Sequence, residues 1–516
     1  MAVSVHETET KYDATAGVVL PSLAALPGVA ASQGPQEQQL DAEYYDTEDL
    51  RLLRAGITLR RRRGGSDEGW HLKLPVGPEA PDSREEIRLP LDQAAPPREL
   101  ADLVRARTRG APLALVATIA TTRQVTTLVS AGGESLAELA DDRVTALIAP
   151  DHQPAAQWRE IEVELTGGGS ELLTAADKVL RRAGLRRSAR SAKLERVLSA
   201  RLERQTRQRL VSPPELDSSS TAGDVVRAYL SAQVEALLAV DPKVRRSQPD
   251  SVHQIRVATR RLRSTLRSFG AVVNRAGTEH LASELQWLGS ILGEARDAEV
   301  QAARLDQHVQ QTDIEQLLGP VQSRIQAYSG KTRANSLAAV AAALKSARYE
   351  ALLDELDRLI ADPPAGDEAC IPAGKALPVA AFRSYRKTRR RMRSALRASA
   401  GRERDAALHQ ARKGAKQTRY VAEAVSPVLG MEAAQLARRM KKLQSVLGDH
   451  QDTVVGRQIS RKLGVAAHLA GESAFSYGLF YGRDACTGER LQQRAVKVWK
   501  KASRARHRGW MAQRSG

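Results

Sequence analysis

The sequence is poor in the residues that would point to three common classes of protein. Phe, Trp and Tyr make up only 4% of the 516 residues, which argues against nucleic-acid recognition by base stacking on exposed aromatic side chains. Cys370 and Cys486 are the only cysteines; they are too few for a disulfide framework and lack metal-ligand spacing, so we expect a reducing compartment. The longest apolar stretch, residues 337–344, is mostly alanine and far too short to span a bilayer.

The N-terminal segment also lacks the marks of a targeting signal. Residues 1–11 are acidic and contain no apolar core, unlike a secretory signal peptide. The sequence therefore predicts a cytoplasmic protein with no membrane partner.

Positive charge, by contrast, is abundant. The formal net charge is +19 and the isoelectric point is about 10.1, which predicts a polyanionic partner: nucleic acid, an acidic membrane surface or a phosphate polymer. Composition alone does not separate these three. The 42% hydrophobic content is that of a folded protein, and the length predicts two or three domains.

The chain changes character near residues 203–222. Before this point, short alternating segments and loops rich in Gly and Pro predict strands; after it, long segments rich in Ala, Leu, Arg and Glu predict helices. We therefore expect a multidomain α+β protein with a strand domain at 3–202, a linker at 203–219 and a helical domain at 220–505. A Pro- and Gly-rich break at 362–378 divides the helical domain into halves at about 220–361 and 379–505.

Charged residues alternate with apolar residues in several predicted strands. Residues 160–165 place three carboxylates on one face and three apolar side chains on the other, and Glu7 and Glu9 share a face roughly 7 Å apart. A sheet with one solvated face is the ordinary explanation for each strand taken singly. The set is unusual, however, because some faces carry only acids and others only bases. The basic residues are Lys11, Arg60, Arg62, Lys73, Arg84, Arg123 and Lys193.

Closing these strands into a barrel would turn both sets of charges into a water-filled tunnel. Glu7 and Glu9, with Glu160, Glu162 and Glu164 from another strand, could then hold divalent cations. Ligands that offer only oxygen favour Mg²⁺ or Mn²⁺. The basic residues would bind a phosphate chain, for which the forked guanidinium of Arg is well suited.

An ordered series of motifs resembles the CYTH, or triphosphate tunnel metalloenzyme, superfamily over roughly residues 3–200. The series is Glu7-x-Glu9-x-Lys11, Tyr44-Tyr45-Asp46-Thr47, Leu59-Arg60-x-Arg62, Lys73, Arg84-x-Glu86, Arg123, Glu160-x-Glu162-x-Glu164 and Lys193. The resemblance implies an eight-stranded antiparallel tunnel (with flanking helices) that hydrolyses triphosphate with Mg²⁺ or Mn²⁺.

The resemblance also implies roles for single residues. Glu7, Glu9 and Lys11 would form the catalytic motif, and the seven basic residues named above, Lys11 included, would bind the phosphates. The metal ligands would be Glu7, Glu9, Asp141, Glu160, Glu162 and Glu164. The sequence departs from the family at the aspartate, because Arg143 stands where the family's D-x-G turn has glycine, and Asp142 fits this position as well as Asp141 does.

The helical part contains an internal repeat. His253-Gln-Ile-Arg256 recurs as His409-Gln-Ala-Arg412, and Leu292-Gly293 followed by Asp297 recurs at nearly the same offset as Leu447-Gly448 followed by Asp452. Spacings of three and four residues place basic side chains on single helix stripes, without acidic partners among them. The stripes are His253, Arg256, Arg260 and Arg263; His409, Arg412, Lys416 and Arg419; and Arg383, Arg386, Arg390, Arg393 and Arg397.

These repeats resemble the CHAD domain over roughly residues 220–505. The resemblance implies two four-helix bundles related by approximate twofold symmetry, with the stripes forming a groove that binds inorganic polyphosphate. The stripe residues, apart from Arg397, are the predicted polyphosphate-binding residues. We expect Gly293 and Gly448 to end helices and Asp297 and Asp452 to pair with nearby arginines.

The sequence thus predicts a triphosphatase specific for inorganic triphosphate, joined to a polyphosphate-binding module and associated with polyphosphate granules. Two alternatives stay open: a non-catalytic polyphosphate scaffold, and hydrolysis of an organic triphosphate such as thiamine triphosphate. Nucleic acid is not the expected partner, since no recognisable nucleic-acid-binding motif is present.

Overall fold

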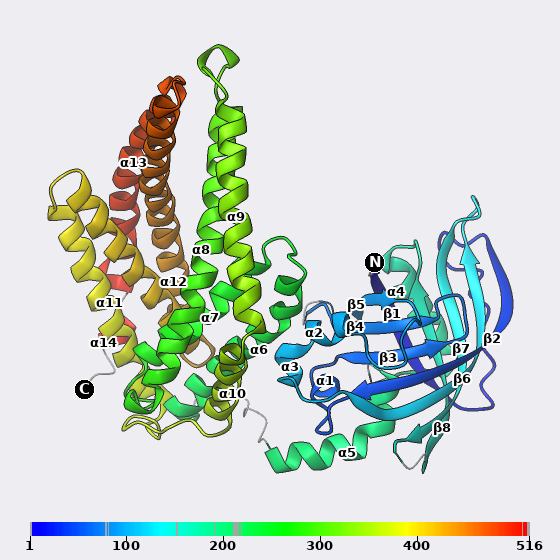
Figure 1. The fold of residues 1–516 in the computed structure, drawn as a ribbon. Coiled ribbons are helices and arrows are strands. Elements are labelled where there is room, and N and C mark those ends of the chain that lie inside the picture. The colour runs from blue at the N-terminus through cyan, green and yellow to red at the C-terminus, as the bar shows by residue number, and fades with distance from the viewer. Residues whose placement is uncertain are drawn as a thin grey trace. The chain divides into compact units, whose positions relative to one another are not determined.

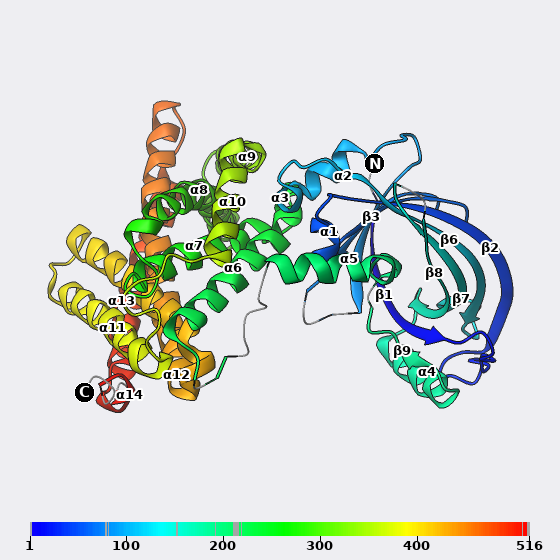
Figure 2. The same ribbon diagram turned by 90° about the horizontal axis from the view of Figure 1, so that it is seen from below.

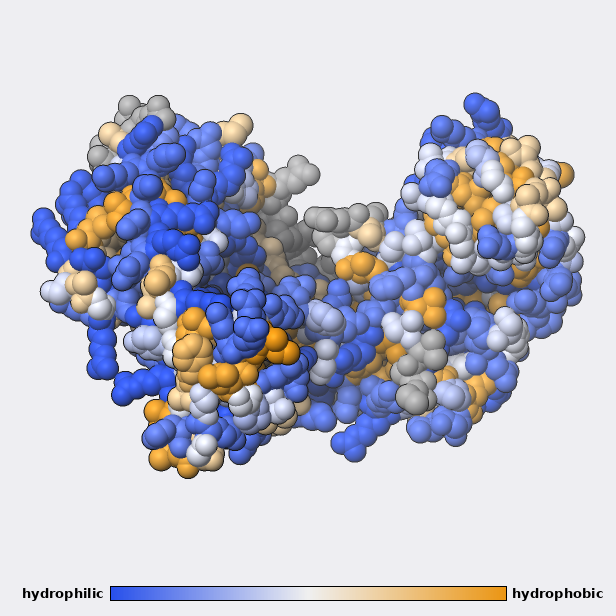
Figure 3. All heavy atoms as spheres, turned by 90° about the horizontal axis from the view of Figure 1, so that it is seen from above, coloured by the Kyte–Doolittle hydropathy of each residue, from blue (hydrophilic) through white to orange (hydrophobic). Residues whose placement is uncertain are grey.

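The computed structural model of the protein describes residues 3–77, 80, 82–150, 153–190, 192–209, 216–217, 219–507 and 509–512. The chain divides into two compact units, Met1–Val211 and Ser212–Gly516 (Figure 1). Hydrophilic side chains cover most of the face drawn in Figure 3, in keeping with 27% charged residues. Within the described ranges, every helix is too short or too polar to cross a membrane.

Unit 1 is built mainly of antiparallel strands. The strands are β1 (Val3–Ala14), β2 (Ala31–Asp46), β3 (Thr58–Arg63), β4 (Gly69–Pro75), β5 (Ser83–Leu89), β6 (Ala114–Val129), β7 (Ser135–Ile148), β8 (Gln153–Leu165) and the short β9 (Arg186–Arg187). The helices are α1 (Arg51–Arg54), α2 (Arg98–Leu103), α3 (Arg105–Thr108), α4 (Ser170–Arg182) and α5 (Lys193–Arg209). Helix α5 therefore continues into the segment predicted as a linker.

Strands β1 to β8 close into a ring. The strand order is β5-β4-β3-β2-β6-β7-β8-β1-β9, and an additional pairing of β5 with β1 completes the circle. Every pairing is antiparallel, and Figure 2 shows β2, β6 and β7 curving together around one side. The predicted eight-stranded antiparallel tunnel is confirmed, with β9 added outside the ring.

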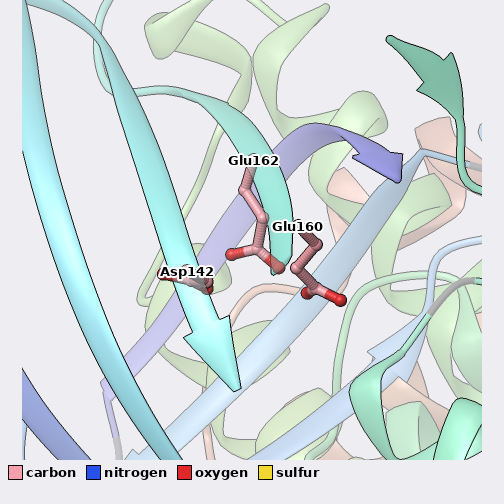
Figure 4. A group of neighbouring side chains, drawn as sticks. All are labelled: Asp142, Glu160 and Glu162. Atoms are coloured by element: carbon pink, nitrogen blue, oxygen red, sulfur yellow. The ribbon is translucent and has the colours of Figure 1, made fainter. Parts of the chain in front are cut away.

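The alternation along the strands explains both faces of the ring. On β8, Ile161 and Val163 are fully buried and pack with Leu172 and Leu180 of α4. Glu160 and Glu162 point to the other side, where they lie together with Asp142 (Figure 4) and Glu162 lines the interior of the ring. Burial of the apolar face stabilises the unit by roughly 25 cal/mol per Å², and the same register carries the carboxylates inward.

Unit 2 is helical throughout its described residues, apart from isolated bridges between loops. Its helices are α6 (Ala222–Arg245), α7 (Ser251–Ser268), α8 (Glu279–Gln310), α9 (Val321–Lys345), α10 (Ala347–Ala361), α11 (Ala373–Arg397), α12 (Arg402–Leu469), α13 (Phe475–Ala502) and α14 (Gly509–Ala512). The predicted break at 362–378 ends earlier than expected, because α11 begins at Ala373 and contains Pro378. Figure 1 shows α8 beside α9 and α12 beside α13.

The duplication of unit 2 is visible in its helix order. Gly430 has a φ of 71°, which breaks α12 into two helices, because this left-handed conformation suits glycine and interrupts the helical ladder. Helices α6, α7, α8 and α9 then correspond in order to α11, the two parts of α12, and α13. The repeated His-x-x-Arg motifs fall on α7 and the first part of α12, and the Leu-Gly motifs on α8 and the second part.

One tight approach inside unit 2 yields a stability prediction. Gly456 of α12 lies against a buried network in which Asp484 accepts hydrogen bonds from Arg304 Nε and His308 Nε2, both at 3.0 Å. A Cβ at position 456 would collide with the Asp484 carboxylate. We expect Gly456→Ala to lower the free energy of unfolding by about 1–3 kcal/mol, the usual cost of overpacking, as measured by urea denaturation.

The matched control is Gly478→Ala on α13. A Cβ there meets no atom within 4 Å, so the change is expected to stabilise the helix by about 0.5–1 kcal/mol. Equal effects of the two substitutions would contradict the predicted collision.

Candidate functional site

The interior of the strand ring is a charged cavity of about 290 Å³. Both signs of charge line it: among the described residues, eight basic and six acidic side chains take part. The basic residues are Lys11, Arg60, Arg62, Lys73, Arg84, Arg88, Arg123 and Lys193, and the acidic residues are Glu7, Glu9, Asp67, Glu138, Glu162 and Glu164. The structure therefore brings together all seven basic residues predicted to bind phosphate.

Three carboxylates form a compact group on the inner side of β7 and β8. Asp142, Glu160 and Glu162 are all buried, and each offers an oxygen within 4.8 Å of the other two (Figure 4). The register places Asp142 opposite Glu160 and next to Glu162 across the β7–β8 ladder. This all-oxygen donor set fits Mg²⁺ or Mn²⁺.

Cations surround this trio. Lys193 Nζ lies 2.8 Å from Asp142 Oδ2, 2.6 Å from Glu160 Oε1 and 2.8 Å from Glu162 Oε1. Arg123 donates to both Asp142 and Glu162, and Lys11 Nζ lies 2.6 Å from Glu162 Oε1. Burial alone would raise the pKa of Asp142, but Lys193 and Arg123 outweigh burial and lower it, so the carboxylate is charged.

Asp141, predicted as the metal ligand from β7, lies on the other face of the strand. Its two carboxylate oxygens accept hydrogen bonds of 2.8 Å from Arg159, away from the cavity. Successive residues of a strand point to opposite faces, so the position next to Glu160 and Glu162 belongs to Asp142. The prediction at Asp141 is corrected to its neighbour.

The other predicted carboxylate ligands form a second acidic region of the cavity. Glu9 faces Glu164 across the β1–β8 pair, and Glu164 in turn faces Glu138 on β7. Lys73 and Arg88 bind Glu7, and Lys11 Nζ lies 3.1 Å from Glu9. Burial, followed by the neighbouring Glu7, raises the pKa of Glu164 to about 7, so this group is able to exchange a proton near neutral pH.

A further layer of residues positions the cations that are predicted to bind phosphate. Glu86 is fully buried, accepts hydrogen bonds from His71 Nδ1 and Arg88, and lies 3.6 Å from both Arg60 and Lys73. Tyr44 is also buried beside Arg60, which lowers the phenol pKa against the opposing effect of burial. No role was predicted from the sequence for Glu86, Arg88 or Tyr44. The alternation of charged residues at Arg84, Glu86 and Arg88 on β5 was a sequence signal for Glu86 and Arg88.

In unit 2, the stripes on α7 and α12 meet in a cationic cluster made of Arg256, Arg260, Arg412 and Lys416. The Lys416 side chain is largely buried, and burial together with these three arginines and Lys413 lowers its pKa to about 6. Arg260 Nε donates a 2.9 Å hydrogen bond to Tyr420 Oη. The strongest influences on the Lys416 pKa are thus burial and neighbouring positive charges.

The repeated glycines lie directly beneath two arginines of this cluster. Gly293 and Gly448 lie inside helices, which corrects the expectation that they end them. A Cβ on Gly293 would lie 3.5 Å from Arg256 Nε, and a Cβ on Gly448 would lie 3.5 Å from Arg412 Nε. Arg256 also lies 3.8 Å from Asp297. The two halves thus pack an arginine over a helix in the same way.

The remaining predicted polyphosphate-binding residues are distributed differently. Arg419 is bound to Glu423 at 2.6 Å, and Arg263 to Gln286. His253 and His409 each have a buried Nδ1 without a hydrogen-bond partner in the described structure. A separate hollow on α11 is lined by exposed arginines together with Val379 and Phe382. These arginines include Arg383, Arg386, Arg390 and Arg393.

Comparison with known proteins identifies the family to which each unit belongs. Residues 6–196 match the family model described as the CYTH domain, and residues 228–461 match the model described as the CHAD domain. The chain is therefore a CYTH domain joined to a CHAD domain. CYTH domains are found in metal-dependent triphosphatases and adenylyl cyclases.

Similarity to a whole protein is also clear. The chain is 37% identical to the uncharacterized protein Rv2226 of Mycobacterium tuberculosis strain H37Rv, over 97% of this chain and 96% of the relative, and MT2285 of strain CDC 1551 / Oshkosh matches equally. The chain belongs to the same family as these proteins.

Two solved structures are more distantly similar. PptA from Streptomyces chartreusis is 18% identical with a TM-score of 0.46, over 55% of this chain and 100% of that chain. The CHAD domain of Ricinus communis is 22% identical with a TM-score of 0.43, over 56% of this chain and 94% of that chain.

Proposed function

We propose that the CYTH ring hydrolyses inorganic triphosphate with Mg²⁺ or Mn²⁺, and that the CHAD domain binds inorganic polyphosphate. The observation that carries the first part is a cavity lined by many cations, with a buried trio of carboxylates that reaches the cavity through Glu162. Phosphoryl transfer requires mainly alignment and neutralisation of negative charge. Such a lining supplies both.

The residues of the ring divide these tasks. Asp142, Glu160 and Glu162 would hold one divalent cation, with Glu7 and Glu9 available to a second, which leaves the Glu164 carboxylate as a proton acceptor. When bound, the metal would supply positive charge that neutralises phosphate oxygens and favours ionisation of the attacking water. Arg60, Arg62, Arg84 and Arg123, with Lys11, Lys73 and Lys193, align the phosphate chain. Water then attacks the terminal phosphorus, its proton passes to a base such as Glu164, and pyrophosphate leaves.

The cationic cluster of α7 and α12 supports the polyphosphate proposal. Four basic side chains converge there, and Arg256 and Arg412 have forked groups suited to phosphate oxygens. Because like charges repel, their collection in a folded protein suggests a polyanion that neutralises them. The exposed arginines of α11 offer a second surface to the same long chain.

Hydrolysis of an organic triphosphate is the second candidate. It is favoured by apolar residues on the wall formed by β2 and β6, namely Leu40, Ala42, Ile119 and Val125, which line the cavity with Tyr44. Inorganic triphosphate is preferred because Tyr44 is the single aromatic residue among the described lining residues and is buried beside Arg60. A non-catalytic scaffold is the third candidate, and the carboxylate trio argues against it.

A substrate panel tests these candidates. Phosphate release would be measured from inorganic triphosphate, thiamine triphosphate and ATP, with Mg²⁺ or Mn²⁺, for the wild type and Glu162→Gln. We expect metal-dependent release from inorganic triphosphate that Glu162→Gln lowers by at least about 100-fold, the usual effect of losing one group that stabilises the transition state. Faster release from thiamine triphosphate would favour the organic substrate. No release from any substrate, by protein that still retains long-chain polyphosphate, would leave the scaffold.

A further inference from the structure

The Lys193 ammonium lies at the centre of the carboxylate trio. Its Nζ is 2.6–2.8 Å from one oxygen of each of Asp142, Glu160 and Glu162. These are the same three side chains whose oxygens lie close enough together to ligate one metal ion. A lysine ammonium and a divalent cation cannot occupy this position together, because both need the same oxygens and they repel each other.

The contact of Lys193 with the trio is incomplete. Glu160 Oε1 is buried and has no hydrogen-bond partner of acceptable geometry, although Lys193 Nζ is 2.6 Å away. The Glu160 residue is only 6% exposed. An ammonium has three donors, and none of them reaches this oxygen at hydrogen-bond geometry, so the trio has an acceptor that the lysine does not satisfy.

The surrounding structure lets the side chain move while the backbone stays in place. Lys193 is the first residue of α5, and the next turn of this helix is fixed by Leu194, Val197 and Leu198, which are buried in a hydrophobic cluster of unit 1. The lysine itself also lines the cavity. Its four-carbon stem is flexible enough to turn from the carboxylates towards a ligand in the cavity.

From this geometry we infer that Lys193 is a built-in competitor of the metal: it occupies the trio in the free protein and is released to the phosphate chain when the metal binds. This inference rests on the proposed function for the identity of the metal and phosphate. It adds that the metal and the phosphate chain favour each other's binding. The metal replaces the positive charge that leaves the trio with Lys193, and the phosphate chain binds the lysine that the metal displaces.

The test is a titration of Mn²⁺ binding in the absence of phosphate. The electron paramagnetic resonance signal of free Mn²⁺ reports how much metal stays unbound. We expect Lys193→Met to bind Mn²⁺ at least about tenfold more tightly than the wild type, since the competitor is gone. Lys193→Arg keeps the charge and should bind within about threefold of the wild type. The matched control is Arg62→Met, which removes one charge from the same cavity but is paired with Asp67 instead of a proposed metal ligand.

Two results would overturn the inference. Weaker or unchanged Mn²⁺ binding by Lys193→Met would show that the lysine helps the metal or does not meet it. Equal tightening by Arg62→Met would reduce the effect to the general charge of the cavity. Thermal unfolding of each variant shows whether it is folded. Because no turnover is measured, failure of the proposed triphosphatase activity would be seen separately, in the substrate panel.

Discussion

Asp142→Asn is expected to reduce the turnover of inorganic triphosphate by about 100- to 1000-fold, whereas Asp141→Asn should leave it within about twofold. The reduction has the size seen when one preorganised electrostatic contact to a transition state is lost. Asp142 is fully buried, belongs to the carboxylate trio and binds Arg123 and Lys193. Asp141 is its neighbour in the chain but binds Arg159 on the outer face of the ring.

The two variants form a closely matched pair. Each removes one carboxylate charge from the same strand and keeps the shape of the side chain, so a difference between them reports the position of the group. The measurement is kcat and KM for triphosphate across a range of Mg²⁺ concentrations, with thermal unfolding as a check of folding. If the defect arises from metal binding, high Mg²⁺ should restore part of the activity of Asp142→Asn. A larger loss for Asp141→Asn would show that the inner trio is not the metal site.

This pair also shows where prediction from the sequence stopped. Alternating charge identified the strands and the inward carboxylates of β8, because Glu160 and Glu162 alternate with buried apolar residues along the strand. On β7, two aspartates are adjacent, and a shift of one residue changes the face of every side chain. The ladder to β8, which the sequence does not reveal, decides between them.

Residues that position other side chains were harder to predict from the sequence. Glu86 holds Arg60 and Lys73 from the second layer of the cavity, and such a role depends on three strands meeting. In unit 2, helical spacing identified the stripes correctly but could not show that α7 and α12 approach each other while the arginines of α11 lie exposed. Spacing describes one helix at a time, and the cationic cluster is a property of two.

Lys416→Met is expected to weaken polyphosphate binding by about tenfold or more and, at the same time, to stabilise the protein. In the free protein, burial and the surrounding cations lower the Lys416 pKa to about 6, far below that of an unfolded chain. Folding at neutral pH must therefore remove a proton from this amine, and the resulting loss of stability grows as pH falls from about 10.4 towards 6. Methionine has a similar shape without this cost, so the melting temperature at pH 7.5 should rise.

Binding of polyphosphate has the opposite effect on the protonation of Lys416. A polyanion beside Lys416 favours the charged amine, so binding at pH 7.5 should take up close to one proton. The affinity of the wild type should accordingly decrease as pH rises above about 6, until the pKa of the bound state is passed. His253 and His409 lie on the same stripes and also have lowered pKa values, so their titration adds to the slope at lower pH.

Isothermal titration calorimetry with long-chain polyphosphate, in two buffers of different ionisation enthalpy, measures this proton directly. The wild type should show the uptake and Lys416→Met should lose it. Lys413→Met is the matched control, because Lys413 is exposed, lies one turn away on the same helix and is among the charges that act on Lys416. It should weaken binding only slightly, keep the proton uptake and leave the melting temperature unchanged. Proton uptake that persists in Lys416→Met would assign the linkage to the histidines, and tight binding without any uptake would place polyphosphate away from this cluster.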